Sequence, residues 1–125
     1  MKKAILILST LIFNISCKNY TKAVDVVSAQ QLEEVIRNET NIQLIDVRTA
    51  KEYIAGSIKK AINIDVKNLK SFKEQVGKLN KQESVYVYCQ KGGRSNKASR
   101  ILKELGFEKI YDYAGGYSEW STLNK

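Results

Sequence analysis

A single cysteine, Cys89, follows the apolar run at residues 84–88 and begins a short loop that ends at Arg94. The loop reads Cys89-Gln90-Lys91-Gly92-Gly93-Arg94, and a helical pattern runs from Ser95 to Leu105. Backbone N–H groups can converge in such a loop, and the positive end of the following helix adds to them, so the loop can bind an anion. We expect a thiol there to have a pKa below the ordinary value of about 8.5 and to react as the thiolate.

The remaining loop residues suit this chemistry. Gly92 and Gly93 allow a tight turn in which the backbone approaches an anion closely, and Lys91 and Arg94 add positive charge. Two simpler interpretations stay open at this point. Cys89 could be a buried structural cysteine at a strand end, and Arg94 could brace the loop by pairing with an acid such as Glu119 or Asp46.

The composition excludes several other kinds of site. The chain has 125 residues, which suffices for one compact domain. It contains no histidine, so a Ser-His-Asp or Cys-His catalytic pair and most transition-metal sites are excluded. We expect neither a metal nor another cofactor. The two cysteines, Cys17 and Cys89, are far apart, which excludes a Cys-x-x-Cys dithiol site.

Strand and helix signals alternate along the chain. Apolar runs predict five strands, at residues 24–27, 42–45, 61–64, 84–88 and 109–113. Amphipathic patterns predict helices that begin after Ser28 and Thr49, both in capping boxes, and helices over residues 66–79, 95–105 and 117–123. This alternation is typical of an α/β fold with a parallel sheet and helices on both faces. Ligands bind at the carboxyl ends of such strands, which is where Cys89 falls.

Four segments, taken in order, resemble rhodanese-domain sulfurtransferases. The loop matches the family's Cys-x-x-Gly-x-Arg pattern, and residues 44–53 match its D-V-R…E-Y/F segment. Residues 56–64 are similar to its G-H-I-x-G-A-x-N-I segment, and residues 114–120 to its closing G-G-x-x-x-W. The likeness runs from Val24 to Trp120. Ser57 replaces the family's usual histidine, and Lys59 and Lys60 replace its common proline and glycine.

The resemblance implies a rhodanese-like domain with a five-stranded parallel sheet and a sulfur-transfer activity. Cys89 would take the outer sulfur of thiosulfate, a persulfide or a polysulfide, hold it as a persulfide, and pass it to a thiol or cyanide. Backbone N–H groups of residues 90–94 would bind the anion, with Lys91 and Arg94 favouring a dianionic donor. Asp46 and Arg48 would form a supporting pair near the loop.

Two alternatives to this enzyme remain. Phosphatases and arsenate reductases of related chemistry place five residues between the cysteine and the arginine, whereas this loop has four, which favours sulfur over a phosphate ester. The domain could also be a persulfide carrier without turnover, or a sulfur-binding or redox-sensing module. The sequence is compatible with both such a module and the enzyme.

The first residues resemble a bacterial lipoprotein export signal. Lys2 and Lys3 precede an apolar stretch at residues 4–15, which is too short to span a bilayer, and Ser16-Cys17 follows it. We expect a signal peptide at 1–16, a lipid-anchor tether at 17–22 with lipid on Cys17, and the rhodanese-like domain at 23–125. The alternatives are an uncleaved short anchor, cleavage elsewhere, or a buried helix.

The net charge of +8 raises the question of a nucleic-acid partner. The basic residues between 59 and 81 alternate with apolar ones at helical spacing, which is typical of a solvated face. Together with the export signal, this spacing argues against nucleic acid and favours anionic substrates or lipid headgroups. We therefore expect a membrane-anchored lipoprotein that is exported to the cell envelope and faces the periplasm.

Overall fold

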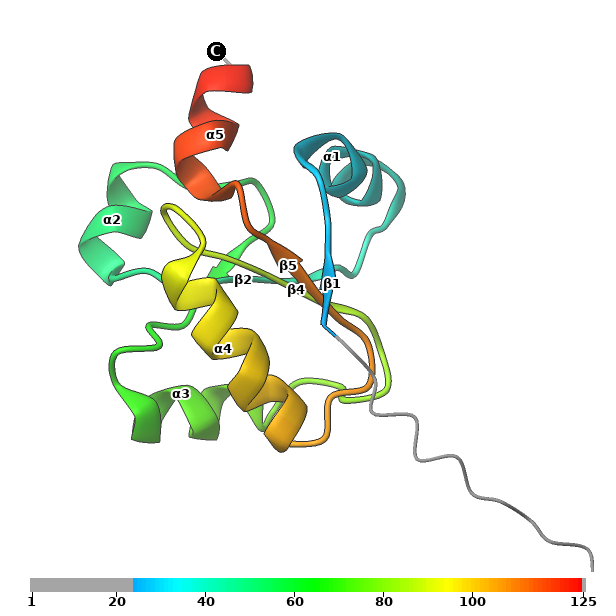
Figure 1. The fold of residues 1–125 in the computed structure, drawn as a ribbon, viewed down its shortest axis with the longest axis vertical. Coiled ribbons are helices and arrows are strands. Elements are labelled where there is room, and N and C mark those ends of the chain that lie inside the picture. The colour runs from blue at the N-terminus through cyan, green and yellow to red at the C-terminus, as the bar shows by residue number, and fades with distance from the viewer. Residues whose placement is uncertain (1–23, 125) are drawn as a thin grey trace, which may run out of the picture.

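A computed structural model of the chain describes residues 24–124 and has one five-stranded sheet at its centre (Figure 1). The strands lie in the order β1-β5-β4-β2-β3, and each neighbouring pair is parallel. Their bounds are β1 (Asp25–Val26), β2 (Gln43–Asp46), β3 (Ile62–Asn63), β4 (Val85–Tyr88) and β5 (Ile110–Tyr113). The α/β prediction with a five-stranded parallel sheet is confirmed.

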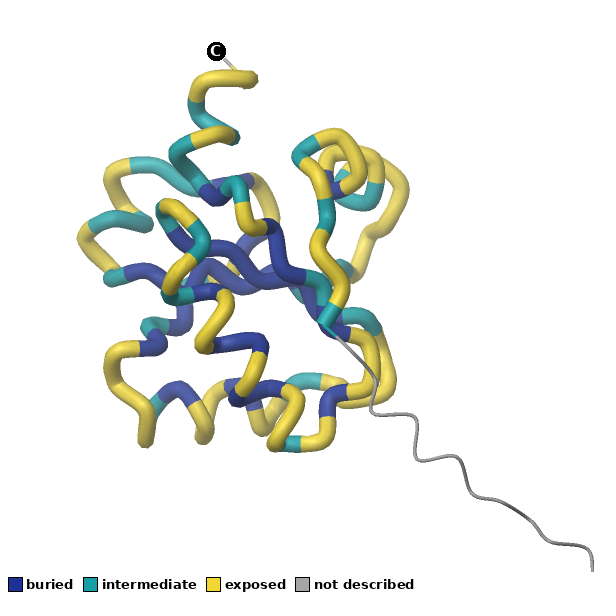
Figure 2. The backbone as a smooth tube through the Cα atoms, in the orientation of Figure 1, coloured by how far each residue is buried: buried dark blue, intermediate teal, exposed yellow. Residues whose placement is uncertain are grey.

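Helices cover both faces of the sheet. They are α1 (Ala29–Asn38), α2 (Ala50–Ala55), α3 (Leu69–Val76), α4 (Gly93–Glu104) and α5 (Gly116–Leu123). In Figure 1, α3 and α4 lie on one side of the sheet, and α1 and α5 lie on the other. Each side has its own apolar cluster, one containing Phe72 of α3 and the other Leu32 of α1. All four residues of β4 are buried, so the strand before Cys89 is a rigid support (Figure 2).

The two predicted capping boxes are both present. The Ser28 hydroxyl accepts from the N–H of Gln31, and the Gln31 side chain accepts from the N–H of Ser28. Thr49 and Glu52 make the same reciprocal pair at the start of α2. Each pair satisfies two N–H groups that have no partner within the helix.

Two helix boundaries differ from the prediction. Helix α3 is shorter than the pattern at residues 66–79, because the N–H of Val66 donates to Val47 O and the helix is capped by Asn68. Helix α4 begins at Gly93, two residues earlier than predicted, because Gly92 adopts a left-handed conformation with φ 99°. Gly93 and Arg94 therefore belong to the first turn of α4.

Lys60 occupies a position where the resembling family commonly has glycine. Its φ is 67°, in the left-handed region that glycine adopts most easily. Its ammonium group donates to the carbonyls of Ile36, at 2.6 Å, and Glu39, at 2.8 Å. These carbonyls lie at the end of α1, where a cation is favourable. Lys60, which replaces the glycine of the family pattern, thus makes two hydrogen bonds that a glycine could not make.

The predicted signal peptide at 1–16 and the tether at 17–22 lie outside the described residues. Within residues 24–124, none of the helices combines the length and the apolar character that crossing a membrane requires.

Candidate active site

Strand β4 places Cys89 at the carboxyl edge of the sheet, where the loop turns into α4. The cysteine is 1% exposed. The N–H of Gly92 donates to its sulfur at 3.0 Å. The thiol lies 3.7 Å from Ser95 Oγ, to which it can donate. The sulfur therefore sits within a turn of backbone and hydroxyl groups rather than among apolar side chains alone.

These contacts lower the pKa of the Cys89 thiol. Burial acts in the opposite direction and raises the pKa, but hydrogen bonds from the backbone and hydroxyl of Ser95 and from the N–H groups of Gly92 and Lys91 outweigh it. The lowered pKa agrees with the expectation from the sequence. The causes that lower it are mainly hydrogen bonds, whereas the sequence also indicated a contribution from the charges of Lys91 and Arg94.

Gly92 is required by the geometry of the loop. With φ 99° it lies in the left-handed region, and a Cβ atom there would stand 2.7 Å from Ala114 O. Gly93 is different, because a Cβ atom there would meet nothing within 4 Å. Of the two glycines predicted to let the backbone turn, Gly92 is therefore the one that a side chain would disturb.

The start of α5 holds the loop from the other side. The N–H of Tyr117 donates to Cys89 O at 2.8 Å, and the N–H of Ser118 donates to Gln90 O at 3.0 Å. Gly116 allows this approach, because its φ is 66° and a Cβ atom would lie 2.5 Å from Gln90 O. The segment at residues 114–120 thus holds the Cys89 loop by hydrogen bonds from its own backbone N–H groups.

Asp46 and Arg48 form a buried ion pair, as predicted. Arg48 Nη2 lies 2.7 Å from Asp46 Oδ2, and the two residues are 2% and 0% exposed. The Arg48 guanidinium also donates to Gly56 O and to Gln90 Oε1, and it lies 4.4 Å from the centre of the Tyr117 ring. Arg48 therefore supports the loop through its hydrogen bond to the side chain of Gln90.

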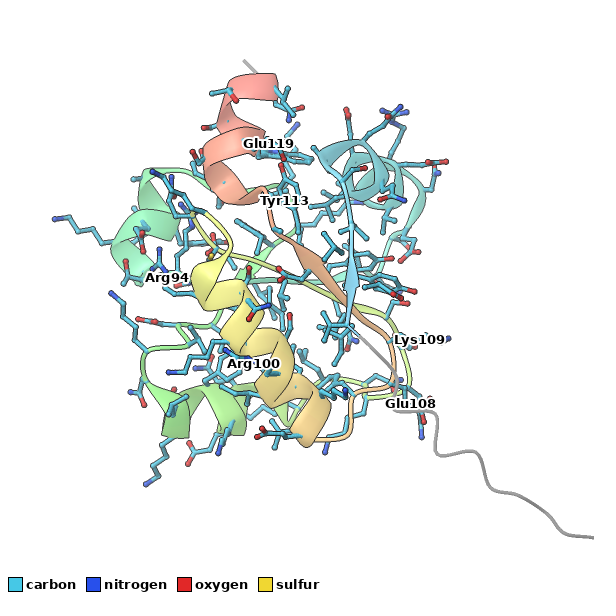
Figure 3. All side chains as sticks on the ribbon, in the orientation of Figure 1. Arg94, Arg100, Glu108, Lys109, Tyr113 and Glu119 are labelled. Atoms are coloured by element: carbon cyan, nitrogen blue, oxygen red, sulfur yellow. The ribbon has the colours of Figure 1, made fainter. Side chains whose placement is uncertain are left out.

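Arg94 does brace the loop, but the predicted partners, Glu119 and Asp46, are wrong. Its guanidinium makes two hydrogen bonds to Glu52, Nη1–Oε2 at 2.7 Å and Nη2–Oε1 at 2.9 Å. Figure 3 shows Arg94 at the start of α4, on the side that faces α2. The hydrogen bond from Arg94 is the main cause that lowers the pKa of Glu52 well below its ordinary value.

The two acids predicted for Arg94 are engaged elsewhere. Glu119 accepts from the Tyr113 hydroxyl at 2.7 Å, and Figure 3 labels both residues, Glu119 above Tyr113. Asp46 is paired with Arg48. Lys91 is exposed at the surface of the loop.

Sequence reasoning missed Ser95 and Glu52. A hydroxyl residue directly after the loop arginine is the one signal that could have indicated Ser95. Glu52 was predicted only as a capping residue and as the acid of the family's D-V-R…E-Y/F segment, and nothing in the sequence shows that α2 lies beside the start of α4. Within residues 24–124 there is no group of three or more acidic or cysteine side chains that could hold a metal ion.

Comparison with known proteins identifies the family. The sequence profile of the rhodanese-like domain matches residues 28–123. The chain belongs to the rhodanese-like domain family. The matched residues include four of the five strands, β2 to β5, all five helices and the Cys89 loop.

The relatives differ in size and in name. The chain is 31% identical over 131 residues to a protein of Schizosaccharomyces pombe named "Putative thiosulfate sulfurtransferase, mitochondrial", covering 94% of this chain and 85% of that one. The chain is 34% identical over 79 residues to the tRNA uridine(34) hydroxylase of Pelagibacter ubique, covering 63% of this chain. It spans about a quarter of the length of such hydroxylases.

A solved structure has the same fold. The human single-domain sulfurtransferase TSTD1 superimposes with a TM-score of 0.71 at 28% identity, and the match covers 82% of this chain and all of that one. The rhodanese-like fold is therefore shared with a protein of one domain.

Proposed function

We propose that this rhodanese-like domain is a sulfurtransferase that carries sulfane sulfur as a persulfide on Cys89. The observation that carries the proposal is the set of hydrogen bonds to the Cys89 sulfur, which lowers the thiol pKa and so provides a nucleophile without a general base. The names of two of the relatives, the Schizosaccharomyces pombe protein and human TSTD1, agree with this activity.

The reaction has two displacements at sulfur. The Cys89 thiolate attacks the outer sulfur of thiosulfate, a new S–S bond forms, and the bond to the sulfite group breaks with its electron pair. Sulfite leaves, and Cys89 holds the persulfide anion. An acceptor such as cyanide or a thiolate then attacks the outer sulfur, which leaves as thiocyanate or as a new persulfide, and the Cys89 thiolate is restored.

The loop provides the environment that each step needs. Backbone N–H groups over residues 90–94 are the donors proposed for the persulfide anion. The exposed ammonium of Lys91 is the group proposed to attract a small dianionic donor. Arg94 is hydrogen-bonded to Glu52 through both of its terminal nitrogens. We therefore propose that Arg94 contributes to donor binding by holding the shape of the loop and through its positive charge.

Intact mass after incubation with thiosulfate or polysulfide tests the proposal. The wild-type domain should gain one sulfur atom, and Cys89→Ala should gain none. Addition of cyanide should remove the extra mass and release thiocyanate. An equal gain in both proteins would show that Cys89 is not the carrier.

A persulfide carrier without turnover is the second candidate, and the relative named "Putative sulfur carrier protein YrkF" from Bacillus subtilis, 25% identical, favours it. Steady-state turnover with thiosulfate and cyanide separates the two. Continuous thiocyanate release that is lost in Cys89→Ser supports the enzyme, and one sulfur per chain without turnover supports the carrier.

We also propose that the chain is exported and anchored by lipid on Cys17, facing the periplasm. Support comes from the sequence of residues 1–17 alone. A membrane-anchored domain would meet small anionic sulfur compounds of the cell envelope rather than nucleic acid.

A further inference from the structure

Charge is distributed unevenly between the two edges of the sheet. The carboxyl edge, where Cys89 lies, consists of the segments in which the parallel strands end and the next helices begin: 27–31, 46–61, 64–70, 89–97 and 114–119. These segments carry nine basic and four acidic residues, whereas the rest of residues 24–124 carries seven basic and nine acidic ones. The net positive charge of the described chain is therefore concentrated around the Cys89 loop.

The acids of this edge already have partners, whereas most of its lysines have none. Asp46 and Glu52 are in the two ion pairs described above. Glu119 accepts from a tyrosine hydroxyl, and Asp65 accepts from a backbone N–H. Six lysines of this edge are exposed, and within residues 24–124 none of them is in an ion pair: Lys51, Lys59, Lys67, Lys70, Lys91 and Lys97.

These lysines are spread over several elements. Lys51 belongs to α2, Lys70 to the first turn of α3 and Lys97 to α4. In Figure 1, α2 and the starts of α3 and α4 lie along the left of the molecule. Figure 3 labels Arg94 on that side, and Glu108 and Lys109, which precede β5, on the right. A small anion bound in the Cys89 loop can contact only a few of these lysines, so the full set fits a partner with an extended acidic surface.

Apolar side chains lie among these charges. Ile54 in α2 is 83% exposed, more than any other large apolar residue within residues 24–124. It follows Lys51 by three residues, so both lie on the same side of the helix. Leu69, at the start of α3, is 42% exposed. Apolar residues surrounded by a polar rim are typical of the surfaces at which proteins bind one another.

We propose that this edge docks an acidic polypeptide that carries the acceptor thiol. The inference rests on the proposed function and names the class of its acceptor. The thiolate of the polypeptide attacks the outer sulfur of the Cys89 persulfide, and a new S–S bond forms between them. The bond from that sulfur to Cys89 Sγ breaks, and its electron pair restores the Cys89 thiolate, so no oxidant or reductant is consumed.

The place where the chain enters the domain favours a polypeptide over a membrane. Val24 is level with the first residue of β5, and Cys89 lies beyond the level of its last residue. The two are thus about four residues, or about 13 Å, apart along the strands. An anchor attached before Val24 would leave the Cys89 edge facing away from the lipid. Nucleic acids and lipid headgroups also have the negative charge, but they carry no thiol.

Sulfur transfer from the loaded full-length chain to peptide thiols tests the proposal. An acidic peptide with one cysteine is compared with the same peptide in which every glutamate is replaced by lysine. At low salt, and for equal amounts of thiolate, the acidic peptide should remove the sulfur at least about tenfold faster. This ratio should fall towards one in about 1 M salt, where the screening length is about 3 Å. Cys89→Ala provides the blank for any reaction of Cys17.

Two pairs of substitutions locate the effect. Lys51→Gln combined with Lys67→Gln should lower the ratio about threefold or more, because two cations of the edge are removed. Lys78→Gln combined with Lys81→Gln is the matched control. It changes the net charge equally, but these lysines precede β4 at the opposite edge, so the ratio should stay at the wild-type value.

Ile54→Ser tests the apolar part of the surface. Leucine is placed at several distances from the cysteine of the acidic peptide. In the wild-type chain, the best of these peptides should react about threefold faster than its serine counterpart. This advantage should disappear in Ile54→Ser. An advantage that persists there would show that Ile54 is not part of the docking surface and would overturn the proposal.

Equal rates for the acidic and basic peptides at low salt would overturn the proposal. A ratio that falls equally in the two lysine pairs would overturn it too, because it would reflect net charge alone. Vesicles of anionic lipid and single-stranded DNA are added as competitors. If either blocks sulfur transfer at concentrations where an acidic peptide without cysteine does not, this edge binds a membrane or a nucleic acid instead.

Thiol–disulfide exchange separates this proposal from the proposed function. The Cys89 thiolate attacks a peptide whose cysteine is joined to thionitrobenzoate, a new disulfide to the peptide forms, and the coloured thiol leaves. No persulfide takes part. The same preference for the acidic peptide in a chain that never forms a persulfide would refute the proposed function and leave the docking edge in place. Persulfide formation without this preference would refute the docking edge alone.

Discussion

Individual residues at this site divide between those that act on the sulfur and those that hold the loop. Cys89 receives hydrogen bonds from Gly92 and Ser95, and these groups lower its pKa. Arg94 is instead held by Glu52, and the side chain of Lys91 lies at the surface. A thiolate stabilised by fixed hydrogen bonds depends less on salt than one stabilised by exposed charges. The proposed attraction of the donor and the activation of the thiol therefore rest on different residues.

The Arg94–Glu52 pair should contribute to stability in a pH-dependent way. The pair holds the pKa of Glu52 below its ordinary value of 4.5, so its stabilisation is complete above that pH and is lost as the pH falls. Because the Arg94 and Glu52 side chains are 26% and 34% exposed, we expect Glu52→Gln to lower the free energy of unfolding by about 1 kcal/mol at neutral pH. Urea unfolding at several pH values should show the difference shrinking below pH 4.5.

Glu33→Gln provides the control for this prediction. Glu33 pairs with Arg37 at 3.4 Å within α1, and both side chains are at least half exposed. Its substitution should change stability little at any pH. Gln at position 52 can still accept from the N–H of Thr49, so the capping box survives. The variant removes the charge and one of the two hydrogen bonds from Arg94, because the NH2 group of glutamine cannot accept. Equal effects of the two variants would mean that the pair between α2 and α4 contributes nothing special.

Only some residues of the candidate site could be predicted from the sequence. Cys89 and its loop could be identified because the residues are consecutive, and the Asp46–Arg48 pair because it is local. The partner of Arg94 could not be identified from the sequence. Three acids were available, Asp46 at the end of β2, Glu52 in α2 and Glu119 in α5, and only the position of α2 beside the start of α4 in the folded domain selects Glu52.

At the scale of elements, the loop is held between α4 and α5. Helix α4 supplies Ser95 from its first turn, and α5 supplies two N–H groups that bind the carbonyls of Cys89 and Gln90. The glycines at the two helix starts, Gly92 and Gly116, allow these backbones to meet. The shape of the loop is thus set by hydrogen bonds between residues 28 positions apart in the sequence, Cys89 with Tyr117 and Gln90 with Ser118.

Gly116→Ala should disturb the loop without changing any residue in it. Alanine would have to adopt φ 66° and would meet the carbonyls of Gln90 and Cys89 at 2.5 and 2.7 Å. We expect the free energy of unfolding to fall by at least about 2 kcal/mol. Alkylation of Cys89 should also slow, because the turn that binds its sulfur would be displaced. Thermal unfolding and alkylation rates measure the two effects.

Gly106→Ala is the matched control for this variant. Gly106 also has a positive φ, 93°, but a Cβ atom there meets nothing within 4 Å. Its substitution should cost only the conformational preference, about 1 kcal/mol, and should leave alkylation unchanged. If both variants lose the same stability and keep the same alkylation rate, the close approach of α5 to the loop has no functional consequence.

For the whole molecule, the alternation of strand and helix signals was enough to predict the α/β class, and the family resemblance implied the five parallel strands. The order β1-β5-β4-β2-β3 could not be read from spacing, because β1 joins the sheet beside the last strand of the chain. The placement of Cys89 at the carboxyl edge was predictable, since parallel strands bring those ends together. Its support by Ser95 and α5 depends on the assembled fold.

The proposed leader at residues 1–16 would determine where the whole molecule acts. Lys2-Lys3, the short apolar stretch and Ser16-Cys17 predict cleavage before Cys17 and lipid attachment to it. The full chain, expressed in a bacterial host, should partition into detergent, and its mature N-terminal peptide should carry the mass of a lipid. Cys17→Ala should lose that mass, whereas Cys89→Ala, the control for cysteine loss, should keep it. A mature N-terminus elsewhere and without lipid would contradict the anchor and leave the chemistry of the Cys89 loop unaffected.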